Sequence, residues 1–312
     1  MISRRALISA AGASLAPSGL ALAASSHRPF SFAAFGCQPY RQEDLDDFDR
    51  LIEEVGRRTA FGIYVGDIKS GSSRCEDGVY QDRLARLDRS RVPIVYTPGD
   101  NEWTDCHRQG DDPLERLDYL RRVFFDRPDQ SRGQRRLRLE TQSVIQPAHT
   151  AFVENATWAY GGIRFATLHV VGSNDNAAVP QEQTVRQAAN LAWLDRCFEL
   201  ARAERAPAVV LAWQADVFVD PPSGQQSGFT VLLHRLRDQT AAFEGRVLVV
   251  HADSHRLASR RLVDASGRET PGLLLLQVMG AEDLHGMRID VDTREPAIFA
   301  ISPLLVPGNA RF

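Results

Sequence analysis

The feature that most constrains the fold is a regular alternation of apolar runs and amphipathic segments in the first part of the chain. Three apolar runs have the length of buried strands: 30–36, 60–67 and 93–100. Three segments with helical spacing of apolar residues follow them in turn: 45–58, 79–90 and 112–125. Such alternation predicts parallel strands joined by crossover helices, and therefore an α/β fold.

The remainder of the chain predicts further strands and two more helices. The runs within 151–172 are expected to form antiparallel strands around a turn at Gly161 and Gly162. The later elements are expected as helices at 181–205 and 228–242, and as strands near 208–216, 246–255, 257–263, 272–279, 287–292 and 297–301. Residues 128–148 are polar and aperiodic, which indicates an inserted loop region within a single domain spanning 28–308.

Polar residues gather where the predicted strands end. Asp67 and Asp100 each close an apolar run, and Asp253 follows a later one. Because parallel strands end at one edge of a sheet, these exits should lie together, where open α/β sheets bind ligands. One Gly-Asp pair is weak evidence, since it also marks ordinary turns, but several together form a pattern. Crowded carboxylates repel one another and need a cation.

Four stretches at these exits resemble the calcineurin-like metallophosphoesterase superfamily: GDIKSG, TPGDNEW, PAVVLAWQAD and VVHADSH. The resemblance extends from about Phe30 to Pro303. It implies a four-layer αββα sandwich, with two mixed sheets flanked by helices. It also implies one or two metal ions at the strand exits and hydrolysis of phosphate esters by a metal-bound water.

The resemblance assigns roles residue by residue. Asp67 matches the aspartate that bridges two metals, and His255 matches one histidine of the last motif. Substitutions that can still bind metal stand at Asp100 and Asp253. In one register Asn101 occupies the place of the catalytic histidine, and in another register it is itself a ligand. Three further positions depart from the family pattern: Cys37 and Pro39 replace its first Asp-x-His motif, and Gln214 replaces a metal-binding histidine.

The ligand chemistry can be judged from the residue types alone. Carboxylates and the Gln214 carbonyl favour manganese, magnesium or calcium. Cys37 as a thiolate would favour zinc or iron, although it is equally a bystander. Asn101 cannot donate a proton to a leaving group, so His251, or with less support His169, is the candidate proton donor.

Lys69 is the only lysine among the 37 basic residues of the chain, and it has three interpretations. It binds substrate phosphate, it replaces a lost metal beside Asp67, or it is an exposed loop residue.

Two functions remain open. The first is an exported metal-dependent phosphoesterase acting on a phosphorylated small molecule or other phosphate ester. The second is a weak or inactive relative that binds a phosphorylated ligand or a protein.

The N-terminus and the cysteines predict export. Ser3-Arg4-Arg5, an Ala-rich stretch and Ala21-Leu22-Ala23 are typical of a twin-arginine signal peptide spanning 1–23, which predicts a periplasmic or secreted protein with no membrane span after cleavage. Cys75 and Cys106 follow Asp67 and Asp100 at similar offsets, so we expect a disulfide between them. A net charge of −3 gives no indication of nucleic-acid binding.

Overall fold

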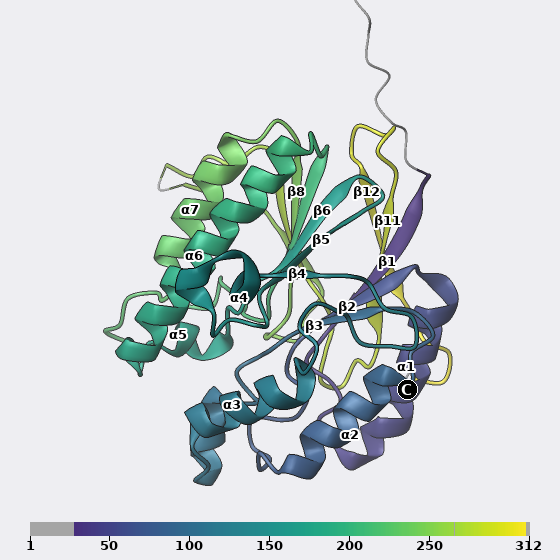
Figure 1. Ribbon diagram of the computed structural model, residues 1–312, viewed down its shortest axis with the longest axis vertical. Coiled ribbons are helices and arrows are strands. Elements are labelled where there is room, and N and C mark those ends of the chain that lie inside the picture. Colours follow the sequence, from purple (N-terminus) through teal and green to yellow (C-terminus); the bar gives the residue numbers. More distant parts are fainter. Residues whose placement is uncertain (1–27, 265, 310–312) are drawn as a thin grey trace, which may run out of the picture.

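A computed structural model describes residues 28–264 and 266–309, and the predicted signal peptide lies outside these residues. Two β-sheets pack face to face (Figure 1). The first contains β1 (Phe30–Phe35), β2 (Phe61–Val65), β3 (Ile94–Thr97), β11 (Gly286–Val291) and β12 (Phe299–Leu304), in the order β12-β11-β1-β2-β3. The second contains β4 (Glu140–Thr141), β5 (Ala156–Tyr160), β6 (Ile163–Thr167), β7 (Ala208–Ala212), β8 (Arg246–His251), β9 (Ala258–Arg260) and β10 (Leu273–Gln277), in the order β4-β5-β6-β7-β8-β10-β9.

Helices cover the outer face of each sheet (Figure 1). The first sheet is covered by α1 (Leu45–Arg58), α2 (Asp77–Asp88) and α3 (Pro113–Phe124). The second is covered mainly by α6 (Pro180–Ala203) and α7 (Thr230–Ala241). Short α4 (Gln142–Ile145) and α5 (Gly172–Asn176) lie in connections. The four-layer αββα arrangement is therefore confirmed, and among the described helices none is long and apolar enough to cross a membrane.

The buried side chains form one layer between the sheets and one under each set of helices. In the central layer Phe32 stacks on Phe61 at 5.5 Å between ring centroids, and Phe165 of the other sheet meets Phe32 edge-on at 5.3 Å. Strands that alternate between two such layers are apolar on both faces, which explains the continuous apolar runs in the sequence. The sheets are thus fixed against each other by aromatic packing.

Strand directions agree with the sequence pattern. The strands β1, β2 and β3 are parallel, as are β6, β7, β8 and β10. The predicted antiparallel hairpin joins β5 to β6, and both turn residues, Gly161 and Gly162, have positive φ values of 56° and 80°. A two-residue turn of this kind needs left-handed backbone at both positions, which glycine adopts without steric cost. The carboxyl ends of the parallel strands carry the candidate site.

Candidate metal centre

Three acidic side chains converge at the strand ends. Asp67 follows β2, Asp100 follows β3, and Asp253 follows β8. One carboxylate oxygen from each lies within 4.8 Å of the others. All three come from different strands of two sheets, so the packing of the sheets creates the cluster. Oxygen atoms this close can reach one cation, because ligand distances for hard divalent ions are about 2–2.6 Å.

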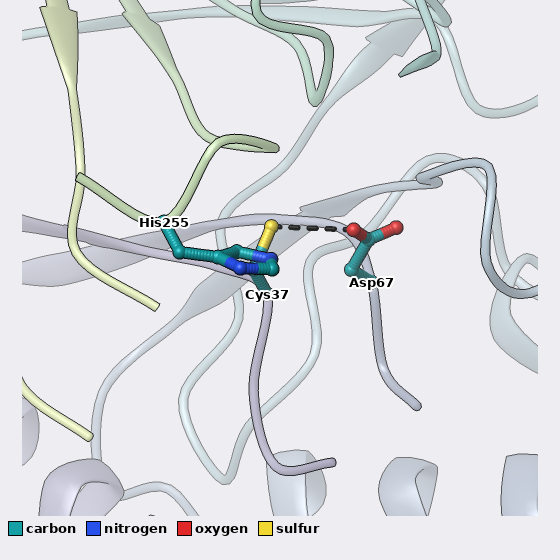
Figure 2. Close-up of side chains that lie close together, drawn as sticks. All are labelled: Cys37, Asp67 and His255. Carbon is teal, nitrogen blue, oxygen red and sulfur yellow. Dashed lines mark hydrogen bonds between the residues drawn. The ribbon is translucent and has the colours of Figure 1, made fainter. Parts of the chain in front are cut away.

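A second group lies beside the first and shares Asp67 with it. Cys37, Asp67 and His255 also place one potential ligand atom each within 4.8 Å of one another, and Figure 2 shows the three side chains together. The thiol of Cys37 donates a hydrogen bond of 3.2 Å to Asp67 Oδ2. Each group could therefore hold an ion, and Asp67 belongs to both groups.

The backbone at these positions is strained. Positive φ values are found at Cys37 (53°), Asp67 (60°), Asp253 (75°) and His255 (58°). Non-glycine residues adopt this left-handed region at a cost of roughly 1–3 kcal/mol each, and the surrounding structure must hold them there. At Cys37 the amide donates 2.9 Å to the carbonyl of Gly66, which fixes the chain as it leaves β1. Four of the candidate ligands therefore depend on the surrounding structure to hold their backbone.

Burial and crowding change the ionisation of the cluster. Burial, and then the charge of Asp100, raise the pKa of Asp67 well above its usual range. The same two causes raise the pKa of Asp253 to about 7. Each shift shows that the charged form is disfavoured in the absence of a counter-charge. The cluster is thus built to gain stability from a bound cation.

Tyr40 is a member of the centre that the sequence did not indicate. Its hydroxyl lies 3.1 Å from Asp67 Oδ2, 2.9 Å from His255 Nε2 and 3.2 Å from Asn101 Nδ2. The hydroxyl of Tyr40 thereby connects Asp67, which belongs to both groups, to His255. The available signal was its position three residues after Cys37, at the exit of the first strand.

Asn101 and His251 have different surroundings. Asn101 lines the cavity described below, and its backbone N–H donates a hydrogen bond of 3.3 Å to Asp67 Oδ1. Asp100 supplies one carboxylate of the cluster, and a ligand role for Asn101 stays a prediction. His251 is fully buried on the face of β8 that packs against the helices, and neither ring nitrogen has a partner among the described residues. His251 does not line the cavity, and burial lowers its pKa to about 4, so the expectation that it donates a proton at the site is wrong.

Lys69 is placed differently from two of its three interpretations. It is 1% exposed, and its ammonium donates to the backbone carbonyls of Ser70 (2.8 Å) and Asn101 (2.7 Å). Among the described residues it forms no ion pair within 4 Å, and it does not line the cavity. The expectations of a phosphate ligand and of an exposed lysine are therefore wrong, whereas a role as substitute for a metal near Asp67 stays a prediction. Lys69 thereby links the loop after β2 to the loop after β3.

Glu102 fixes the same loops. Its carboxylate accepts backbone N–H groups from Asp67 (3.1 Å), Ile68 (3.3 Å) and Gly99 (2.7 Å), and the hydroxyl of Tyr96 (2.7 Å). It is fully buried. The acidic residues of the GDNEW stretch thus divide their roles, because Asp100 faces the cluster while Glu102 orients the backbone that carries Asp67.

A left-handed turn at residues 173–176 forms part of the wall of the cavity described below. The four residues 173–176 all have φ between 52° and 56°, although none is glycine. Asparagine, aspartate and serine populate this turn, and the first two tolerate left-handed backbone better than most residues. Ser173 Oγ donates 2.8 Å to Asp100 Oδ2 and contacts Asp105 Oδ1 at 3.2 Å. The preceding Gly172 is required by space, since a Cβ atom there would lie 2.6 Å from Asp100 Oδ2.

These walls enclose a cavity of about 740 Å³. Its lining includes Asp67, Asp100 and Asp253, together with Tyr40 and His255.

The predicted disulfide joins Cys75 and Cys106, two residues that follow the acidic strand ends. It is confirmed with a Cα–Cα distance of 5.8 Å. The bridge connects the loop after β2 to the 3-10 helix at Thr104–Gln109. The cavity is therefore wide enough for a small molecule and fixed on one side by a covalent link.

Comparison with solved structures identifies this architecture. A dimetal phosphatase from Danio rerio aligns with 89% of this chain and 100% of its own, at 14% identity and a TM-score of 0.53. The chain has the metallophosphoesterase fold. A purple acid phosphatase from yellow lupin aligns with 89% of this chain at 10% identity and the same TM-score, and the chain spans about half (54%) of its length. No protein-family model and no curated protein sequence matches the chain.

Gln214 stands where the sequence resemblance implies a metal-binding histidine. Its Nε2 donates to Asp67 Oδ2 and Asp100 Oδ1, both at 3.1 Å, while its Oε1 accepts the backbone N–H of Gly172 at 2.6 Å. Because that backbone group can only donate, the orientation of the amide is fixed. The expectation that the Gln214 carbonyl is a ligand is wrong in this arrangement. Gln214 instead holds two candidate ligands in place.

The donor atoms present fit divalent ions. The group of three carboxylates offers only oxygen, which suits manganese, magnesium or calcium. The group of Cys37, Asp67 and His255 offers sulfur, oxygen and nitrogen, which suits zinc or iron. The thiol pKa of Cys37 is raised by burial and by Asp67, so a cation is needed for it to bind as thiolate. Pro39 has no side-chain donor, so it supplies no ligand to either group of three.

Proposed function

We propose that this chain is a metal-dependent phosphoesterase. The observation that carries the proposal is the pair of ligand groups that share Asp67 at the wall of one cavity. The fold is shared with proteins described as phosphatases, which supports the same class of reaction. Phosphate esters are therefore the proposed substrates, with one or two divalent ions as the cofactor.

The residues of the chain have separable roles in this proposal. Bound divalent cations neutralise phosphoryl oxygens and lower the pKa of a water molecule. Asp67 and Asp100 would hold the ions, while the Gln214 amide keeps their carboxylates oriented. The amide of Asn101 offers a second N–H to a substrate oxygen beyond the one donated to Tyr40. Positioning and electrostatic stabilisation thus carry the catalysis.

Two observations favour the second candidate, a relative with weak or no catalysis that binds a phosphorylated ligand. Gln214 places N–H donors between Asp67 and Asp100 without adding a ligand atom. In one of its two registers Asn101 takes the place of the family's catalytic histidine without a titratable proton, and an absent general acid commonly costs about 10²- to 10⁴-fold in rate. A low turnover is therefore the expected form of the activity.

The test combines metal content with hydrolysis. Mature protein purified without chelator should contain transition or alkaline-earth metal, and manganese should support cleavage of p-nitrophenyl phosphate or its bis ester. Asp67→Asn should abolish metal retention and hydrolysis, because both ligand groups lose a charge. Asp220→Asn, which changes an exposed carboxylate at the cavity wall, is the matched control. Metal-free protein that hydrolyses neither ester after manganese addition would leave only the binding function.

We propose in addition that the protein is exported by the twin-arginine route to the periplasm or beyond. The Ser3-Arg4-Arg5 sequence supports this, as does the disulfide between Cys75 and Cys106, because disulfides persist in oxidising compartments. Replacing both Arg4 and Arg5 by lysine should leave uncleaved precursor in the cytoplasm in a fractionation experiment. Unchanged export of that variant would contradict the route.

A further inference from the structure

The cavity contains a single strong cationic side chain. Arg108 is the only arginine or lysine among the described residues that line it. The other charged lining residues include six aspartates: Asp67, Asp100, Asp105, Asp216, Asp220 and Asp253. Positive charge favours the binding of an anion in such an acidic cavity. Besides bound metal ions, Arg108 is the side chain that provides this charge.

Arg108 lies beside the candidate metal centre. A Cβ atom added to Gly71 would lie 2.6 Å from Asn101 Oδ1 and 2.9 Å from Arg108 Nη1, so both side chains crowd the same small residue. Asn101 in turn donates its backbone N–H to Asp67 Oδ1. The guanidinium is therefore separated from the shared ligand by one residue, and Gly71 leaves the space that a larger side chain would fill.

The position of Arg108 is held from two sides. Its Nη1 forms an ion pair of 2.7 Å with Asp105 Oδ2, and Asp105 is 2% exposed. Ser173 lies 3.2 Å from the other carboxylate oxygen of Asp105, which connects this pair to the left-handed turn. The disulfide at Cys106 anchors the same 3-10 helix. Half of the Arg108 side chain remains exposed, and its other N–H groups have no partner among the described residues.

We propose that Arg108 binds the phosphoryl oxygens of the substrate, with Asp105 as the residue that positions its guanidinium. This inference rests on the proposed phosphoesterase function and names its anion-binding residue. The planar guanidinium presents paired N–H donors that match two phosphate oxygens, and only its Nη1 is paired with Asp105. The phosphate would lie between the metal ions and Arg108, with Asn101 next to it. Substrates are selected by the phosphate group and not by the acidic remainder of the cavity.

The test measures binding of inorganic phosphate to the manganese-loaded protein by calorimetry. Arg108→Ala should weaken phosphate binding by about 10- to 100-fold, the effect of losing a hydrogen bond to a charged group. Arg108→Lys should lie in between, because it keeps the charge without the paired donors. Arg74→Ala is the matched control, since Arg74 is exposed, pairs with Asp111 and does not line the cavity. It should bind phosphate as the wild type does.

Two readouts separate this inference from the function on which it rests. The rise in melting temperature with manganese should be the same in all four proteins, which shows that each is folded and binds metal. If the wild type hydrolyses phosphate esters and Arg108→Ala binds phosphate equally well, the inference is wrong and the function stands. If the manganese-loaded wild type binds no phosphate, the inference is also wrong. If the wild type shows neither a manganese response nor hydrolysis, the proposed function itself fails.

Discussion

Replacing Asp253 by asparagine should reveal the repulsion within the carboxylate cluster through the pH dependence of stability. The pKa of Asp253 is raised to about 7 by burial and by Asp100, whereas an aspartate in an unfolded chain titrates near 3.9. Between these values the folded protein binds more protons than the unfolded chain. Without metal, this group therefore destabilises the fold increasingly as the pH rises, and its full cost is reached above about pH 7.

The size of the effect follows from the same two pKa values. One fully linked proton changes the free energy of unfolding by ~1.4 kcal/mol per pH unit. Across the range from pH 5.5 to 7.5, with titration nearly complete at the upper end, the Asp253 contribution amounts to about 2 kcal/mol. The buried His251 has the opposite tendency, since burial lowers its pKa to about 4. The difference in the free energy of unfolding between wild type and variant at each pH does not contain the contribution of His251.

The assay is urea denaturation of the mature protein at both pH values, with chelator present. The stability of Asp253→Asn relative to wild type should increase by about 2 kcal/mol from pH 5.5 to 7.5. Manganese at a hundredfold excess over its Kd should then stabilise the wild type by about 2.7 kcal/mol at pH 7.5, and the variant by much less. Asp220→Asn, the exposed control, should follow the wild type throughout. A stability difference for Asp253→Asn that is constant with pH would refute the electrostatic reasoning.

Three further changes test the support of the site. The double variant Cys75→Ser with Cys106→Ser should lose roughly 2–4 kcal/mol in urea denaturation, and reductant should destabilise the wild type but not the variant. Glu102→Gln should cost about 1–3 kcal/mol, because an amide nitrogen replaces one acceptor of the surrounding donors; unchanged stability would show that those hydrogen bonds contribute little. Gln214→His should increase zinc affinity in a calorimetric titration, since an imidazole adds a ligand next to Asp67 and Asp100; weaker binding would show that the amide clamp matters more.

Much of the architecture could be predicted because it depends on local pattern. Alternating apolar and amphipathic segments give the parallel strands and crossover helices whatever their distant partners are. The convergence of Asp67 and Asp100 follows from adjacent parallel strands, and so does the pairing of Cys75 with Cys106. The prediction that carboxylates meet at the strand exits needed only the direction of the strands, whereas their roles as ligands came from the resemblance.

The orientation of single side chains was decided by tertiary contacts. Gln214 donates to the carboxylates because a backbone N–H of Gly172, distant in sequence, takes its carbonyl. His251 faces the helices because strand alternation continues through β8, and Lys69 turns inward toward two carbonyl groups. Tyr40 enters the site because the loop after β1 folds back over Asp67. A sequence determines which strand end a residue follows, whereas the partner that fixes its side chain comes from another part of the chain.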